Sequence, residues 1–290
     1  MKKKMEFVDY NNPDEGSISK QVKNKSRKIG EIIGEKYILT QKISSSSISS
    51  FYFATDKKGS SKYVIREDTN AIGDEEFRNS KDYFITAMNV IDGLKCMGVP
   101  RIEDLFEQDG SFFIVRACLE GSSLSELMKK NGPFSERDAI SKAEDLCEIY
   151  ACLHANNPPI IYGGCEMNHI FILQDNQMVL LDVEYAIYCT YNPIRRNPSS
   201  SGCRPPEMFS FNEKPDPRTD IYGIGGLLYS LLLGHEIAYE DYPYQFSDLP
   251  KTISLKTRKI IYKCLQADIG KRYLIIRDLI NALEKAKAGV

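Results

Sequence analysis

The stretch Asp220-Ile221-Tyr222-Gly223-Ile224-Gly225-Gly226-Leu227-Leu228-Tyr229-Ser230-Leu231-Leu232-Leu233 belongs to the longest apolar run of this 290-residue chain. A helix that crosses a bilayer needs about 20 consecutive apolar residues. The run is shorter than that, and it contains two tyrosines and several glycines. We therefore predict a buried helix over 219–233 and no membrane span.

Helical signals continue on both sides of this segment. The strongest are serine caps and apolar residues at helical spacing. They predict one helix after Ser122 or Ser123 that ends at Asn131-Gly132, a second after the capping box Ser135–Asp138, and two more near 254–265 and 275–287. Two short apolar runs near 170–172 and 178–181 fit a small hairpin, whereas 185–217 shows no regular pattern.

The amino-terminal half has a different pattern. Residues 1–30 are polar and predict a flexible tail. Short β-rich runs then predict strands, with a single amphipathic helix over 74–97. The strand candidates are 37–43, 50–55, 62–66, 103–106 and 111–115. Strands that precede a block of helices predict an α+β fold or two lobes.

Composition narrows the class of protein. The apolar fraction is 42 % and the charged fraction 27 %, which is typical of a folded globular chain. The net charge of −2 argues against a nucleic-acid binder. No apolar stretch follows Met1-Lys2-Lys3-Lys4, so we expect no signal peptide. The eight cysteines include no Cys-x-x-Cys pair, and we interpret them as buried thiols in a reducing cytoplasm. The three histidines are far apart, which argues against a zinc site.

Several short motifs resemble those of eukaryotic-type Ser/Thr protein kinases, and most closely those of the bacterial members. They occur in the expected order at Gly98–Ile102, Pro158–Tyr162, Leu180–Asp182, Gly202–Glu207, Asp220–Gly225 and Gly270–Tyr273. The resemblance implies a bilobal fold. Residues 31–117 would form a small antiparallel β-sheet lobe with one helix, and 118–290 a larger, mainly α-helical lobe.

The resemblance also implies two structural contacts. Glu207 and Arg272 match the family's buried ion pair, which ties the end of the activation segment to the carboxy-terminal helices. Asp220 matches the aspartate that supports the backbone of the catalytic loop.

The catalytic loop departs from the family pattern. The His-Arg-Asp motif reads Tyr162-Gly163-Gly164, so the position of the base that would accept the substrate's hydroxyl proton holds Gly164. The asparagine that would hold a second metal ion is His169. Glu166 or Asn168 is an alternative base.

The phosphate-binding elements are altered as well. Serines stand where the phosphate-covering loop would have glycines, namely at Ser44, Ser46 and Ser49. Arg66 replaces the lysine of the third strand, which keeps the charge but not the shape. The glutamate that would pair with it falls at Ala87, with Asp82 and Glu76 as alternatives in other registers.

The positions that would contact adenine and the first metal ion are also partly changed. Arg116 falls at the gatekeeper position, where it would either fill the purine slot or lie on the solvent side of its strand. Asp182 is retained and could hold one Mg²⁺. Glu184 replaces a glycine and would act as a built-in anion or as a solvent-facing carboxylate.

These departures favour a pseudokinase: a kinase-like protein without catalysis that acts as a binding or regulatory scaffold. Its partner would be another protein, with an active kinase or its substrate as candidates. The alternative is a divergent transferase or ATP sensor that uses ATP and Mg²⁺ through Arg66 and Asp182.

Overall fold

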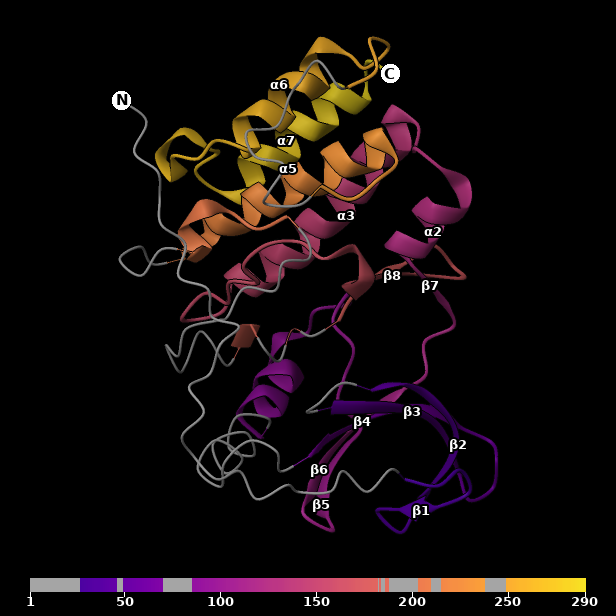
Figure 1. Cartoon of the computed structure of the whole chain (residues 1–290). Helices are drawn as coiled ribbons and strands as arrows, with labels where there is room; N and C mark the ends of the chain where they lie inside the picture. Colours follow the sequence, from indigo (N-terminus) through magenta and orange to yellow (C-terminus); the bar gives the residue numbers. More distant parts are fainter. Residues whose placement is uncertain are drawn as a thin grey trace, which may run out of the picture.

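The computed structural model describes residues 27–45, 49–69, 85–181, 183, 186–187, 203–209, 215–237 and 249–290. A lobe built on a β-sheet and a lobe built on helices lie one above the other (Figure 1). Several predictions fall outside the described residues: most of the tail, Glu76, Asp82, Asp182, Glu184, Ser46 and the side chain of Ser49.

Six strands form one antiparallel sheet within the described part of the chain, in the order β1-β2-β3-β4-β6-β5. They are β1 (Ile32–Ile33), β2 (Tyr37–Ser45), β3 (Ser49–Asp56), β4 (Lys62–Thr69), β5 (Asp104–Gln108) and β6 (Ser111–Ala117). All five strands expected from the sequence are present, and the two-residue β1 was not expected.

The two faces of this sheet pack against different cores. Phe113 and Val115 of β6 belong to a small cluster inside the sheet, together with Ile33, Tyr37, Leu39, Tyr52, Ala54 and Ile65. Phe112 and Ile114 alternate with them, so they point the other way and join the main core. Residues 85–94 are helical and reach the same main core through Ala87 and Ile91.

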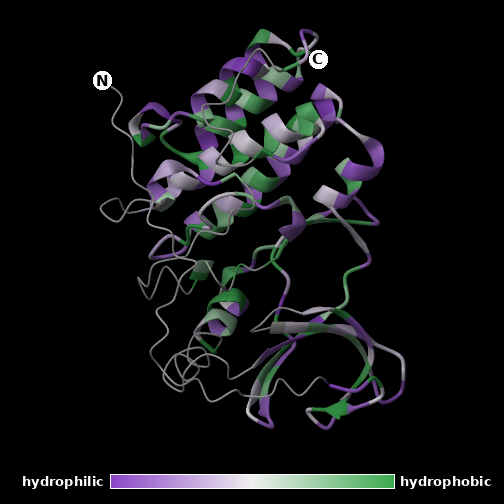
Figure 2. Cartoon of the chain, viewed as in Figure 1, coloured by the Kyte–Doolittle hydropathy of each residue, from purple (hydrophilic) through white to green (hydrophobic). Residues whose placement is uncertain are grey.

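The helical lobe contains α2 (Leu124–Asn131), α3 (Glu136–His154), α5 (Pro217–Leu233), α6 (Leu255–Cys264) and α7 (Ile276–Lys287). Ser123 and Ser135 are the N-caps of α2 and α3, as predicted. Hydrophobic and hydrophilic residues alternate along the outer helices (Figure 2). In α5, by contrast, nearly every residue is buried, so the predicted buried helix is confirmed. No helix among the described residues has the length and apolar character to cross a membrane.

A second sheet lies at the edge of the helical lobe that faces the first sheet (Figure 1). The expected hairpin is present as β8 (Ile170–Leu173) and β9 (Met178–Leu180). A third strand, β7 (Gly121–Ser123), pairs with β8 and was not expected. In the part of the chain that the structure describes, short 3₁₀ segments at Met167–His169, Pro206–Phe209 and Ile269–Lys271 connect the larger elements.

The sheet lobe begins earlier than the expected boundary at residue 31. The Arg27 side chain is only 4 % exposed, and it forms ion pairs with Glu31, Glu67 and Asp109. Gly30 also donates its backbone N–H to the carbonyl of Leu39 at 2.7 Å. Residues 27–30 are therefore part of the lobe.

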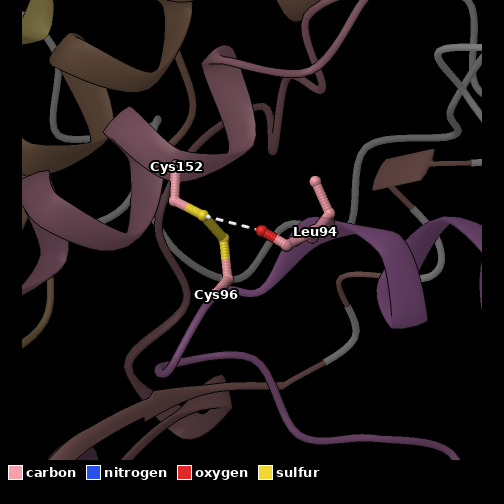
Figure 3. Close-up of a disulfide and its surroundings, with 3 residues drawn as sticks. All are labelled: Leu94, Cys96 and Cys152. Atoms are coloured by element: carbon pink, nitrogen blue, oxygen red, sulfur yellow. Dashed lines mark hydrogen bonds between the residues drawn. A yellow bond between two sulfur atoms is a disulfide. The ribbon is translucent and has the colours of Figure 1, made fainter.

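The interpretation of the cysteines needs a correction. Cys96 and Cys152 form a disulfide (Figure 3), whereas the sequence predicted that all eight cysteines are thiols. The two lie 56 residues apart and come together only because the segment after helix 85–94 packs on α3. The other described cysteines are free thiols.

Candidate functional site

The loop at residues 162–164 lies against the first turn of α5. Asp220 is fully buried there and accepts hydrogen bonds from the backbone N–H of Tyr162 at 2.9 Å and of Gly163 at 2.6 Å. His154 Nε2 lies 2.8 Å from the same carboxylate. The structure thus confirms that Asp220 supports the loop that corresponds to the catalytic loop.

The backbone of this loop needs glycine. Gly163 has φ 88° and Gly164 has φ 137°, both in the region that side chains rarely adopt. A Cβ on Gly164 would lie 3.0 Å from the carbonyl oxygen of Cys203. On the other side, a Cβ on Gly223 of α5 would lie 2.6 Å from the carbonyl of Gly164. A side chain at the position expected to hold a catalytic base would therefore meet Cys203 and Arg204, while α5 packs closely on the backbone of Gly164.

Tyrosine hydroxyls fix the loop further. Tyr150 is fully buried and donates its hydroxyl to the carbonyl of Gly164 at 2.7 Å. Burial raises the pKa of Tyr150 well above its usual value, so this hydroxyl stays protonated and remains a donor. The Tyr162 hydroxyl donates to the carbonyl of Leu181 at 3.1 Å and lies 3.2 Å from His169 Nδ1.

The alternative bases differ in their surroundings. Glu166 forms an ion pair with Arg204, and its other oxygen lies 3.5 Å from His169 Nε2. An arginine that bonds to a carboxylate occupies part of its capacity to accept other hydrogen bonds. Glu166 is thus engaged in a structural contact, whereas Asn168 is exposed.

The two nitrogens of His169 lie beside other polar groups, Nδ1 3.2 Å from the Tyr162 hydroxyl and Nε2 3.5 Å from the Glu166 carboxylate. Among the described residues, no three His, Cys, Asp or Glu side chains converge as a metal site. Asp182, the expected first ligand, lies outside the described residues.

The segment that carries Arg204 is paired with the loop through its backbone. Cys165 and Cys203 form an antiparallel bridge, in which the N–H of each donates to the carbonyl of the other at 3.1 and 3.0 Å. Burial raises the pKa of the Cys165 thiol, which keeps it neutral in this position. The bridge and the Arg204–Glu166 pair together join the end of the activation segment to the loop.

The predicted structural ion pair is confirmed. Arg272 donates from both terminal nitrogens to Glu207, at 2.5 and 2.9 Å, and the arginine side chain is fully buried. The guanidinium also donates to the carbonyls of Gln266 and Arg218. Such a fully bonded charge pair offsets the cost of removing both ions from water.

Arg66 and Arg116 share one face of the sheet. Arg66 pairs with Ile114 across the strands and Arg116 pairs with Val64, so both lie on the face that carries Ile114. Arg66 donates from Nε to Asp68 of its own strand at 2.8 Å. Arg116 is partly exposed. The structure thus brings the two predicted arginines onto the face that adjoins the main core.

Two further residues that the sequence assigned to the site are Ser44 and Ala87. Ser44 is exposed in β2, and residues 46–48 that follow this strand lie outside the described residues. Ala87 is fully buried and offers no carboxylate to Arg66. Asp68, on the same strand as Arg66, is instead its carboxylate partner, and this residue was not predicted. Its signal was the i, i+2 spacing, which places two strand residues on one face.

The fold and this loop architecture define the class of protein. Residues 37–281 match the model of the protein kinase domain, and the chain belongs to that family. Relatives in this family generally use ATP with Mg²⁺.

Two curated relatives place the chain within the family. A probable serine/threonine-protein kinase of Clostridium perfringens is 24 % identical over 278 residues, which cover 89 % of this chain and 39 % of the relative. Serine/threonine-protein kinase B of Synechocystis is 26 % identical over 202 residues, which cover 64 % of this chain and 34 % of the relative. The chain thus spans between a third and two fifths of the length of these two relatives.

Solved structures agree on the fold. The kinase domain of Mycobacterium tuberculosis PknI superposes with a TM-score of 0.68 at 15 % identity, covering 90 % of this chain and 99 % of that domain. A double mutant of the same domain gives a TM-score of 0.69 at 15 % identity, with the same coverage of both chains. The bilobal kinase fold predicted from the sequence is confirmed.

Proposed function

We propose that this chain is a pseudokinase, a kinase-fold protein that binds and regulates without transferring phosphate. The observation that carries the proposal is the backbone at Gly164. A general base must reach the proton that it abstracts. Gly164 supplies no side chain, and its positive φ and its contact with Cys203 resist the addition of one.

The surrounding contacts support the same function. Glu166 is the carboxylate nearest in sequence, and it is paired with Arg204. His169 replaces a metal-binding asparagine and is placed between Tyr162 and Glu166. Phosphoryl transfer depends on positioned metal ions and on an oriented nucleophile. Both requirements are weakened here, while the structural contacts of Asp220 and Glu207 are retained.

The direct test is a phosphate-transfer assay on the full chain. Purified protein is incubated with labelled ATP, Mg²⁺ or Mn²⁺, and mixed Ser/Thr substrates, beside an active bacterial kinase domain as the positive control. We expect no incorporation above that of heat-denatured protein. Incorporation that disappears in Glu166→Gln would make Glu166 the base and would overturn the proposal.

Nucleotide binding distinguishes the scaffold from the sensor. Arg66 keeps a cation at the position of the phosphate-binding lysine, which is the feature that favours an ATP sensor. A thermal-shift series with ATP, ADP and Mg²⁺ separates the two. A scaffold shows no stabilisation, whereas a sensor shows a magnesium-dependent rise that is lost in Arg66→Ala. The protein partner and the cytoplasmic location stay predictions.

A further inference from the structure

The disulfide joins two parts of the chain that belong to different lobes. Cys96 follows helix 85–94 of the sheet lobe, and Cys152 lies in the last turn of α3 in the helical lobe (Figure 3). Their Cα atoms are 6.0 Å apart, within the range that a disulfide spans without moving the backbone. The bond therefore forms in the folded arrangement.

The neighbouring contacts show that the two lobes are packed directly against each other here. A Cβ on Gly98 would collide with Ile149, one turn before Cys152 in α3. The carbonyl of Gly98 also accepts a hydrogen bond from the N–H of Leu180 at 2.8 Å. A covalent bond at this junction fixes the end of helix 85–94 against α3.

The junction also accommodates the reduced pair. Cys152 Sγ lies 3.6 Å from the carbonyl oxygen of Leu94. Leu94 is the last residue of its helix, where carbonyls lack an intrahelical donor. A Cys152 thiol can donate to this oxygen, and a disulfide sulfur cannot. Each oxidation state therefore has a contact that suits it.

Accessibility separates these two cysteines from the buried ones, which are Cys147, Cys165, Cys203 and Cys264. Cys96 and Cys152 are partly exposed, so a small disulfide can reach them. Cys147 and Cys165 are buried, and burial raises the pKa of each thiol. Since the thiolate is the form that attacks a disulfide, the buried thiols react slowly.

We propose that Cys96 and Cys152 form a reversible redox tether between the lobes, defined as the disulfide that joins these two residues. Oxidised glutathione is the class of oxidant that closes it. One protein thiolate attacks its S–S bond and releases one glutathione thiol. The second protein thiolate then displaces the other glutathione, so the Cys96–Cys152 bond forms as two glutathiones take up the two protons. The tether does not depend on whether the chain transfers phosphate.

The first experiment measures the bond itself. The full chain is equilibrated in glutathione buffers that range from reduced to oxidised, and free thiols are alkylated and mapped by mass spectrometry. We expect Cys96 and Cys152 to lose alkylation together as the buffer becomes oxidising, while Cys118 stays labelled. Equal labelling of Cys96 and Cys152 at both ends of the range would overturn the proposal.

The second experiment measures the constraint. Reduction should lower the melting temperature by about 5–10 °C, because it frees a long loop in the unfolded chain. It should also raise hydrogen exchange in 85–102 by about tenfold, with no change in α7. A bond that forms without either change would show that it does not constrain the lobes.

Variants make the assignment specific. Cys152→Ser should melt at the temperature of the reduced wild type and lose its response to glutathione. Cys118→Ser removes another partly exposed cysteine and should keep the full response. If Cys152→Ser does not fold, reduced wild-type protein gives the same comparison. A glutathione response that persists in Cys152→Ser would assign the effect to another cysteine.

Discussion

At the scale of single residues, Gly164 occupies the position that the sequence assigns to a catalytic base. Its backbone has a φ of 137°, and a Cβ on this residue would lie 3.0 Å from the carbonyl oxygen of Cys203. Residue 164 therefore has no proton-accepting side chain, and the conformation of the loop resists the addition of one. An aspartate placed there would have to move the backbone that Tyr150 and Asp220 hold.

We expect Gly164→Asp to destabilise the protein and to leave phosphate transfer undetectable. Forcing a side chain into a positive φ costs about 1–3 kcal/mol, and the contact with Cys203 adds to it. Chemical denaturation measures the loss. Gly59→Asp is the matched control, because Gly59 has φ 70° but open space around it. A smaller loss for Gly164→Asp than for Gly59→Asp would contradict the packing argument.

The sequence identified Gly164 but not the Arg204–Glu166 pair beside it. Motif spacing assigned residue 164 to the base position without any knowledge of the fold. Arg204 and Glu166 lie 38 residues apart, and only the Cys165–Cys203 bridge brings them together. Pairwise contacts of this kind leave no periodic signal in a single sequence. The same reason explains why the Cys96–Cys152 bond was not predicted.

At the scale of elements, helix ends connect the helical lobe. Glu136 begins α3, and its carboxylate accepts from the N–H of Ser254 at 3.0 Å and from the hydroxyl of Thr257 at 2.5 Å. Ser254 is the N-cap of α6. Burial alone would raise the pKa of Glu136, but these hydrogen bonds outweigh it and hold the pKa below its usual 4.5.

The stabilisation by Glu136 should depend on pH. A carboxylate with a lowered folded pKa stabilises the fold above its unfolded pKa, and loses that effect as pH falls through the folded value. Glu136→Gln should therefore cost about 1 kcal/mol at neutral pH, with a gap to wild type that narrows below pH 4.5. Urea denaturation from pH 3 to pH 7 (about the range of carboxylate titration) measures it.

Glu148→Gln is the control for that series, since Glu148 lies on the same helix and its side chain is 60 % exposed. Its ion pair with Arg277 is long, with 3.6 Å between the nitrogen and the oxygen. Its effect should stay within about 0.5 kcal/mol at every pH. A Glu136→Gln gap that stays constant through the acid range would contradict the charge argument.

Most elements were predictable because their signals are local. Serine caps, apolar spacing and the Asp175-Asn176 turn gave α2, α3 and the β8–β9 hairpin. The strands β1 and β7 were missed, because two or three residues carry no alternation. β7 exists through its pairing with β8, which lies about 50 residues further along the chain. Short strands of this kind depend on their partners rather than on their own residues.

At the scale of the whole molecule, the sheet lobe has a core of its own. Phe113 is fully buried in the small cluster with Tyr52 and Ile65, whereas helix 85–94 belongs to the main core. Because the small cluster has fewer members, we expect the sheet to open before the helical lobe. On the sheet-lobe side, the disulfide is attached through Cys96, which packs against the main core and not against the sheet cluster.

Phe113→Ala should reveal this difference. Truncation of a buried phenylalanine costs about 3–5 kcal/mol. We expect hydrogen exchange to rise through β2, β3 and β4 while α3 and α5 stay protected. Ile43→Ala, at a site 44 % exposed in the same sheet, should change neither region. Equal loss of protection in both lobes would mean that the two cores unfold as one unit.

The approach of Gly223 to Gly164 links positions that are 59 residues apart (223 minus 164), because a Cβ on Gly223 would collide with the carbonyl of Gly164. A larger residue at position 223 would therefore displace the loop at 164 even though it lies on a helix outside that loop. The sequence of α5 is thus constrained by the path of a loop that is distant along the chain.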